Sequence, residues 1–85
     1  MTIVVELFSV PHCRYCESAY EQLDEYLAGR DVILRKLNIL DDVDRAVELG
    51  ILRSPALVVD GKLVHQGPLS NRRLTQLFGA PGCQE

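Results

Sequence analysis

The hexapeptide Pro11-His12-Cys13-Arg14-Tyr15-Cys16 stands at the point where one sequence pattern gives way to another. Before it, residues 3–9 are apolar at nearly every position, which predicts a buried central strand. After it, apolar residues recur at helical spacing from Arg14 to about Ala28, and Gly29 is expected to end this helix. The two cysteines are therefore expected where a strand becomes a helix. Unpaired N–H groups and the helix dipole stabilise a thiolate at such a junction.

The spacing of the helix distinguishes the two cysteines from each other. Cys16 falls on the apolar stripe, which continues through Ala19 or Tyr20, Leu23 and Leu27. Cys13 comes before or at the first helical position, where its sulfur can face solvent. This asymmetry suits an attacking thiol and a shielded resolving thiol. The alternative is that Cys16 is an ordinary core residue and Cys13 an incidental neighbour.

Composition limits the class of protein. The chain has 85 residues, of which 47% are hydrophobic and 25% charged, and this predicts one domain at 1–79 with a flexible tail at 80–85. A net charge of −3 without a basic stripe argues against nucleic-acid binding and against acidic membranes. The first residues do not resemble a secretion signal, and no apolar run approaches the roughly 20 residues of a membrane span. We expect a cytoplasmic monomer.

The number of cysteines also indicates a function for the Cys13 and Cys16 pair. Three cysteines are too few for a disulfide scaffold, and in a reducing compartment a close pair is more typical of catalysis or metal binding. The third, Cys83, lies in the expected tail. It is open whether Cys83 is a free thiol, cross-links two chains or pairs with Cys13.

The rest of the chain predicts a second parallel strand and a hairpin. Residues 31–38 are expected to form a strand parallel to the first, followed by a short helix at 41–50. Three aspartates at the start of that helix suggest either capping or a cation site, and we favour capping and compensation of the helix dipole. Asp60-Gly61 between two short apolar runs predicts an antiparallel hairpin with a type I′ turn.

Proline and serine mark the beginnings of the last strand pair and the last helix. Pro55 must open its strand, because proline has no N–H to donate to the ladder. Ser70 is the expected N-cap of the last helix, which ends at Gly79. The apolar face of this helix consists of Leu74, Leu77 and Phe78. The fold class is thus α/β, with a four-stranded mixed sheet in the order βαβαββα along the chain and helices on both faces.

Over about residues 3–79 the sequence resembles a small member of the thioredoxin/glutaredoxin family. Cys13-Arg14-Tyr15-Cys16 resembles the redox motif of the family directly after the first strand. The segment from Leu49 to Ala56 resembles the one that enters the third strand through a cis-proline facing the cysteines. Val59-Asp60-Gly61-Lys62 resembles the family's hairpin.

The resemblance implies a thioredoxin-like fold and a dithiol mechanism. Cys13 matches the nucleophile and Cys16 the resolving thiol. The Ser54-Pro55 bond is expected to be cis on the resemblance alone, since most X-Pro bonds are trans. Ser54 and Pro55 would then bind an extended substrate segment. We also expect Arg14 and Tyr15, which stand between the cysteines, to contact the substrate.

Two departures from the family pattern narrow the expected function. Thioredoxins commonly carry a buried Asp where this chain has Leu7, so proton transfer to and from Cys16 needs another group, for which His12 and Glu6 are candidates. Glutaredoxins typically hold glutathione with residues that this chain lacks before Cys13 and before the last helix, although Arg53 could still meet a carboxylate. We therefore expect reduction of protein disulfides.

The expected partners follow from this function. They are proteins with disulfides and a reductase flavoprotein that draws on NADPH, with glutathione as the weaker alternative. No bound cofactor is expected beyond the redox-active disulfide itself. The direction of electron flow is not predicted by the sequence, because relatives with one architecture differ widely in potential.

Two other classes of function remain open. The cysteine pair could bind zinc with His12 or Cys83, or an iron-sulfur cluster that bridges two chains, although one pair and scattered candidates are a poor set of ligands. The chain could also be a non-catalytic thioredoxin-like binding domain.

Overall fold

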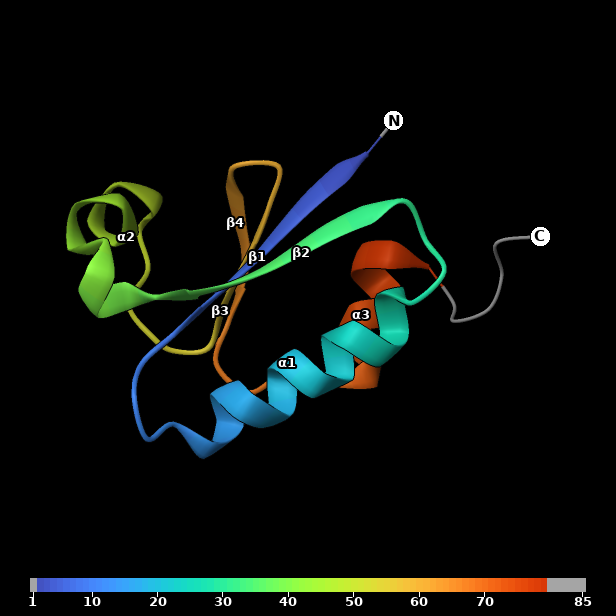
Figure 1. The fold of residues 1–85 in the computed structure, drawn as a ribbon, viewed down its shortest axis with the longest axis horizontal. Helices are drawn as coiled ribbons and strands as arrows, with labels where there is room; N and C mark the ends of the chain where they lie inside the picture. Colours follow the sequence, from blue (N-terminus) through green and yellow to red (C-terminus); the bar gives the residue numbers. More distant parts are fainter. Residues whose placement is uncertain (1, 80–85) are drawn as a thin grey trace.

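Four strands form one mixed sheet in the order β2-β1-β3-β4 (Figure 1). They are β1 (Ile3–Ser9), β2 (Val32–Asn38), β3 (Ala56–Val59) and β4 (Lys62–Gln66). This computed structural model describes residues 2–79, so the expected tail and Cys83 lie outside the described residues. The sheet contains the four strands that the sequence predicted.

The pairing of the strands is also as predicted. β1 runs parallel to β2 from Ile3↔Val32 to Ser9↔Asn38 and antiparallel to β3. β3 and β4 pair as an antiparallel hairpin. Asp60 and Gly61 at its tip have φ angles of 49° and 84°, and positive φ at both central residues is what a type I′ turn requires. The Asp60 carboxylate accepts a hydrogen bond from the N–H of Val4 (2.9 Å), which fastens the tip to β1.

Three α-helices cover the sheet: α1 (Arg14–Leu27), α2 (Val43–Leu49) and α3 (Asn71–Phe78). In Figure 1, α1 and α3 lie together, with α2 apart from them beyond the strands. The predicted boundaries of α1 and α3 are confirmed, and the Ser70 hydroxyl caps α3 by accepting from the N–H of Arg73 (3.2 Å). In the described part of the chain, no helix is long and apolar enough to cross a membrane.

The start of α2 differs from the prediction. A 3₁₀ turn at Ile39–Asp41 precedes it, because the Asn38 side chain accepts a hydrogen bond from the N–H of Leu40 (2.8 Å). Asp42 occupies the N-cap position of α2 but makes no side-chain capping bond. The expected capping role is therefore wrong for Asp42, and only the favourable position of acidic groups at the positive end of the helix dipole remains.

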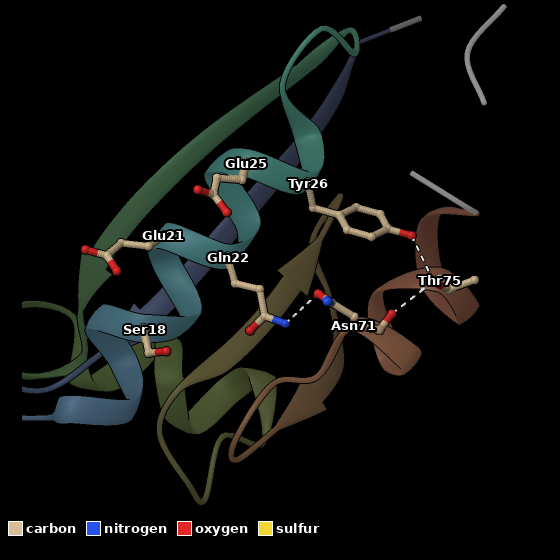
Figure 2. A pocket seen from close by; sticks show the side chains of 7 residues that line it. All are labelled: Ser18, Glu21, Gln22, Glu25, Tyr26, Asn71 and Thr75. Carbon is tan, nitrogen blue, oxygen red and sulfur yellow. Dashed lines mark hydrogen bonds between the residues drawn. The ribbon is translucent and has the colours of Figure 1, made fainter. Parts of the chain in front are cut away.

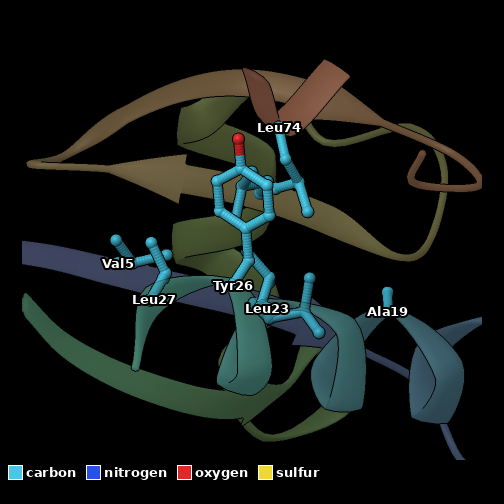
Figure 3. Close-up of a cluster of buried hydrophobic side chains, with 8 residues drawn as sticks. Val5, Ala19, Leu23, Tyr26, Leu27 and Leu74 are labelled. Atoms are coloured by element: carbon cyan, nitrogen blue, oxygen red, sulfur yellow. The ribbon is translucent and has the colours of Figure 1, made fainter. Parts of the chain in front are cut away.

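The larger core lies between the sheet and the pair α1 and α3. Figure 3 shows α1 contributing Ala19, Leu23, Tyr26 and Leu27, which face Val5 of β1 and Leu74 of α3. Leu7 and Leu57 complete the buried set. The predicted stripe of α1 is confirmed, and Tyr26 is an addition to it. A second cluster lies on the opposite face of the sheet and consists of Phe8, Ala56 and Val58 with partly buried neighbours that include Leu49.

Candidate active site

Cys13 is the N-cap residue of α1. Its backbone is extended, with φ −103° and ψ 104°, and helical geometry starts at Arg14. The Cys13 sulfur accepts a hydrogen bond from the N–H of Cys16 (3.1 Å), one of the donors that the first helical turn leaves without a backbone partner four residues back. The predicted position of this residue at the junction of strand and helix is confirmed.

Cys13 and Cys16 form a disulfide, with their Cα atoms 5.2 Å apart. Cys16 is 1% exposed and lies on the buried side of α1, whereas Cys13 is half-buried. A partner molecule can therefore reach the first sulfur more easily than the second. The asymmetry that the helical spacing predicted is present in the folded chain.

A proline loop lies at the same edge of the sheet as the cysteines. Because β1 and β3 are antiparallel with Phe8 opposite Ala56, the segment after β1 and the segment before β3 leave the sheet together (Figure 1). The Ser54-Pro55 bond is cis, as the family resemblance implied. Pro55 is fully buried and Ser54 is half-buried. The fold thus brings together two segments separated by about forty residues in the sequence.

Arg14 and Tyr15 lie in the first turn of α1, and both side chains are exposed. Tyr15 is 65% exposed, which is unusual for a large aromatic ring. Their position beside the disulfide agrees with a role in contacting a substrate, but that role remains a prediction.

An open hollow of about 370 Å³ lies beside the disulfide. Two charged side chains, Glu17 and Lys36, line it, and of these Lys36 was not connected with the cysteines by the sequence. Lys36 comes from β2 and lies opposite Leu7 in the parallel register, so its side chain is on the same face of the sheet as α1. The full lining is Ser9, Val10, Pro11, His12, Cys13, Cys16, Glu17, Lys36, Leu37 and Asn38.

Of the two candidates for proton transfer to Cys16, only His12 lines this hollow. Glu6 lies on the opposite face of β1, where its carboxylate accepts two hydrogen bonds from the Arg45 guanidinium of α2 (2.6 and 2.7 Å). The hydrogen bonds from Arg45 hold the pKa of Glu6 below its ordinary value of 4.5. The prediction that Glu6 could serve Cys16 is therefore wrong, and the alternation of side chains along β1 explains why.

A larger groove of about 550 Å³ lies between α1 and α3, away from the cysteines (Figure 2). Two hydrogen bonds between its lining side chains join the two helices: Gln22 hydrogen-bonds to Asn71, and the Tyr26 hydroxyl to the Thr75 hydroxyl (3.0 Å). We interpret this groove as a seam between helices and not as the active site. Its lining is Ser18, Glu21, Gln22, Glu25, Tyr26, Asn71 and Thr75.

The metal alternatives find no support in the described part of the chain. Among residues 2–79, no three His, Cys, Asp or Glu side chains lie close enough to hold an ion together. His12 is near the cysteine pair but adds only one ligand, and a structural zinc site needs four. The other proposed ligand, Cys83, lies outside the described residues.

Comparison with known sequences shows the family to which the chain belongs. The family described as a thioredoxin domain matches residues 1–79. The chain belongs to the thioredoxin family. A probable thioredoxin of Methanothermobacter thermautotrophicus is 32% identical to it over 76 residues, covering 87% of this chain and 89% of the relative. A probable thioredoxin of Methanothermobacter marburgensis is 29% identical over 87 residues, covering 100% of this chain and 88% of that one.

Solved structures agree on the fold of this thioredoxin-family protein. A mutant thioredoxin from Halobacterium salinarum superposes with a TM-score of 0.72 at 22% identity, covering 88% of this chain and 70% of that one. Mitochondrial thioredoxin 3 of Saccharomyces cerevisiae, in its oxidised form, gives a TM-score of 0.62 at 26% identity, with 74% and 62% covered. The expected thioredoxin-like fold is confirmed.

Proposed function

We propose that this thioredoxin-family protein reduces disulfide bonds of other proteins by dithiol exchange. The observation that carries the proposal is the Cys13–Cys16 disulfide at the start of α1, with Cys13 half-buried and Cys16 fully buried. Such a pair has two defined chemical states, a dithiol and a disulfide, and exchanges electrons two at a time. The structure represents the oxidised state.

The first step of the proposed reaction starts from the dithiol form. The Cys13 thiolate attacks one sulfur of the substrate disulfide, so that a Cys13–substrate bond forms and the substrate S–S bond breaks. The released substrate thiolate takes up a proton. The N–H of Cys16, which lies 3.1 Å from the Cys13 sulfur in the disulfide form, would stabilise the attacking thiolate.

The second step releases the reduced substrate. The Cys16 thiol loses its proton and attacks the Cys13 sulfur, which forms the Cys13–Cys16 disulfide and expels the second substrate thiolate. The expelled thiolate also takes up a proton, so the substrate has gained two electrons and two protons. The protein has lost the same number, counted from the dithiol in which both Cys13 and Cys16 carry a proton. The hollow beside the disulfide supports this step, because it connects the buried Cys16 with solvent and with His12, Glu17 and Lys36.

Substrate binding is proposed at the backbone of Ser54. Within residues 2–79, neither the N–H nor the C=O of Ser54 makes a hydrogen bond. Both groups are therefore available to pair with an extended substrate segment, in the way that a strand adds to a sheet edge. Pro55 fixes the direction of this backbone, and the exposed side chains of Arg14 and Tyr15 would contact the substrate from the other side of the cysteines.

Regeneration requires a donor of two electrons. We propose a cytoplasmic reductase flavoprotein that draws on NADPH, with glutathione as the alternative donor. The two relatives described as probable thioredoxins favour the first donor, since thioredoxins are generally served by a reductase. The protein itself would then need no bound cofactor.

Trapping with single-cysteine variants tests the two roles. Cys16→Ser should accumulate mixed disulfides with substrate proteins, whereas Cys13→Ser should neither trap nor reduce them, because only Cys13 attacks substrate. The adducts would be counted by mass spectrometry after non-reducing separation. Trapping by Cys13→Ser would reverse the assignment, and a wild-type protein that never forms the Cys13–Cys16 disulfide in thiol–disulfide buffers would end the proposal.

A further inference from the structure

The segment Leu52–Ser54 lies directly before the cis-proline and outside the strands. One side chain, from the end of β4, makes hydrogen bonds to its backbone. Gln66 is the last residue of β4, and its side-chain oxygen accepts hydrogen bonds from the N–H of Leu52 (2.5 Å) and the N–H of Arg53 (2.9 Å). Within residues 2–79, these are the only hydrogen bonds that residues 52–54 make. The conformation of this segment therefore depends on one amide oxygen.

Packing does little to hold the same segment. Leu52 is 88% exposed, and Arg53 is also exposed. The residues on either side are anchored independently: the N–H of Ile51 donates to the C=O of Ala46 (2.9 Å), and the C=O of Pro55 accepts from the N–H of Gly67 (2.8 Å). Removal of the Gln66 oxygen would thus free residues 52–54 while leaving both ends fixed.

The strand register explains how Gln66 reaches the segment. Gln66 is paired with Ala56 across the hairpin, so the two side chains share the face of the sheet that α2 covers. The chain returning from α2 to β3 lies against this face at Ile51, which packs on the cluster of Phe8, Ala56 and Val58. The side chain of Gln66 therefore reaches the segment while its backbone stays paired with Ala56 in the β3/β4 hairpin.

We propose that Gln66 is a positioning residue for substrate binding: it holds the backbone of Leu52–Ser54 in the conformation to which an extended disulfide-bearing segment pairs. This inference rests on the proposed function and identifies what gives the binding segment its order. A segment that is ordered in advance loses less conformational entropy when substrate binds, so the oxygen of Gln66 strengthens substrate binding without touching the substrate.

The test compares two substitutions at position 66 with one matched control. Gln66→Met keeps the length of the side chain and removes the acceptor, whereas Gln66→Glu keeps an acceptor oxygen. Gln76→Met makes the same chemical change on α3, where the exposed Gln76 accepts from Arg73 of its own helix (3.0 Å). All variants would be assayed with insulin as the disulfide substrate and with iodoacetamide as a small reagent for Cys13.

Gln66→Met should raise KM for insulin about tenfold, because residues of the segment must then be ordered on binding. It should change kcat and the rate of Cys13 alkylation by less than about twofold, since no reacting atom is touched. Gln66→Glu and Gln76→Met should keep the wild-type KM. An unchanged KM in Gln66→Met overturns the inference, as does a Gln66→Glu variant as impaired as Gln66→Met.

Amide hydrogen exchange separates this inference from the proposed function. In Gln66→Met the N–H groups of Leu52 and Arg53 should exchange at least about tenfold faster than in the wild-type protein, while that of Ile51 stays protected. This readout requires no activity. Unchanged exchange overturns the inference even if insulin is reduced. If these N–H groups exchange faster in Gln66→Met but the wild-type protein does not reduce insulin, then Gln66 does order the segment and the proposed function is wrong.

Discussion

The two faces of β1 are built on different principles. Toward α1 and α3, the strand presents Val5 and Leu7, which are buried in a cluster of apolar side chains. Toward α2, it presents Phe8 and Glu6; Glu6 is 6% exposed, and its carboxylate is paired with Arg45. The guanidinium of Arg45 also lies 5.4 Å from the centre of the Phe8 ring. β1 thus contributes only apolar side chains to the first face, whereas it contributes one half of an ion pair to the second.

This difference shows that moving a carboxylate by one residue along a strand changes the face of the sheet on which it lies. In the family pattern, a buried carboxylate stands at the position of Leu7, on the side of the redox helix. Here the carboxylate belongs to residue 6 instead, so it points to the opposite face. The acidic group therefore stabilises the attachment of α2 and is not available to the cysteines.

Moving the carboxylate across the strand should have the largest effect. Leu7→Asp would place a carboxylate where the wild-type side chain is 1% exposed, and should cost about 3 kcal/mol at neutral pH, because Lys36, opposite it on β2, would offset only part of the cost of burying the charge. Burial would raise the pKa of this Asp in the folded state. The cost relative to the wild-type protein should then be smallest below about pH 4, the unfolded value, and grow as the pH rises.

Urea denaturation between about pH 3 and pH 7 measures this effect, with Leu7→Asn as the matched control. Asn has nearly the same shape but no charge, so its loss of stability should not depend on the ionisation of residue 7. Equal pH dependence in the two variants would mean that position 7 is open to solvent.

Breaking the ion pair should have the next largest effect. Arg45→Met leaves the Glu6 carboxylate largely buried without its main partner and should destabilise the protein by about 2 kcal/mol, less than for a fully buried pair because the Arg45 side chain is 35% exposed. Urea denaturation at pH 7 measures the loss. The double variant Glu6→Leu with Arg45→Met should recover most of it, and a simply additive result would show that the two residues do not interact.

The ion pair also predicts a dependence on pH with the opposite sign to that of Leu7→Asp. Because Arg45 lowers the pKa of Glu6 below 4.5 in the folded state, the unfolded chain takes up the proton first as the pH falls. The stabilisation is thus complete above about pH 4.5 and is lost as the pH falls through the lowered value. Glu6→Gln should lack this component, so its stability difference from the wild-type protein should shrink in urea titrations as the pH falls below about 4.5.

The outer side of α2 should tolerate change most easily. Val47 is 72% exposed, and alanine has the higher helix propensity, so Val47→Ala should alter the free energy of unfolding by less than about 0.5 kcal/mol. A loss above about 1 kcal/mol in the same urea assay would mean that this side of α2 packs against something within the molecule.

Much of the fold could be predicted because its signals are local. The apolar run at 3–9, the helical spacing after Arg14 and the Asp60-Gly61 turn each specify one element from neighbouring residues, and all were confirmed. Capping of α2 by Asp42 was predicted wrongly, because a competing local bond to Asn38 forms a 3₁₀ turn first. The cis bond before Pro55 came from family resemblance and not from the residues themselves.

The sequence by itself determined that a cysteine pair starts a helix after a buried strand and that the second cysteine lies on the inward stripe. Only the tertiary structure decided that Glu6 pairs with Arg45 of α2 and that Lys36 lies beside the cysteines. The same is true of the hydrogen bonds between Gln66 and the segment before Pro55. Each of these contacts joins segments far apart in the chain, and its existence depends on strand register and on which face a side chain takes. Local periodicity predicts an element, but a shift of register by one residue exchanges the faces, so these partners are fixed only when the strands have paired.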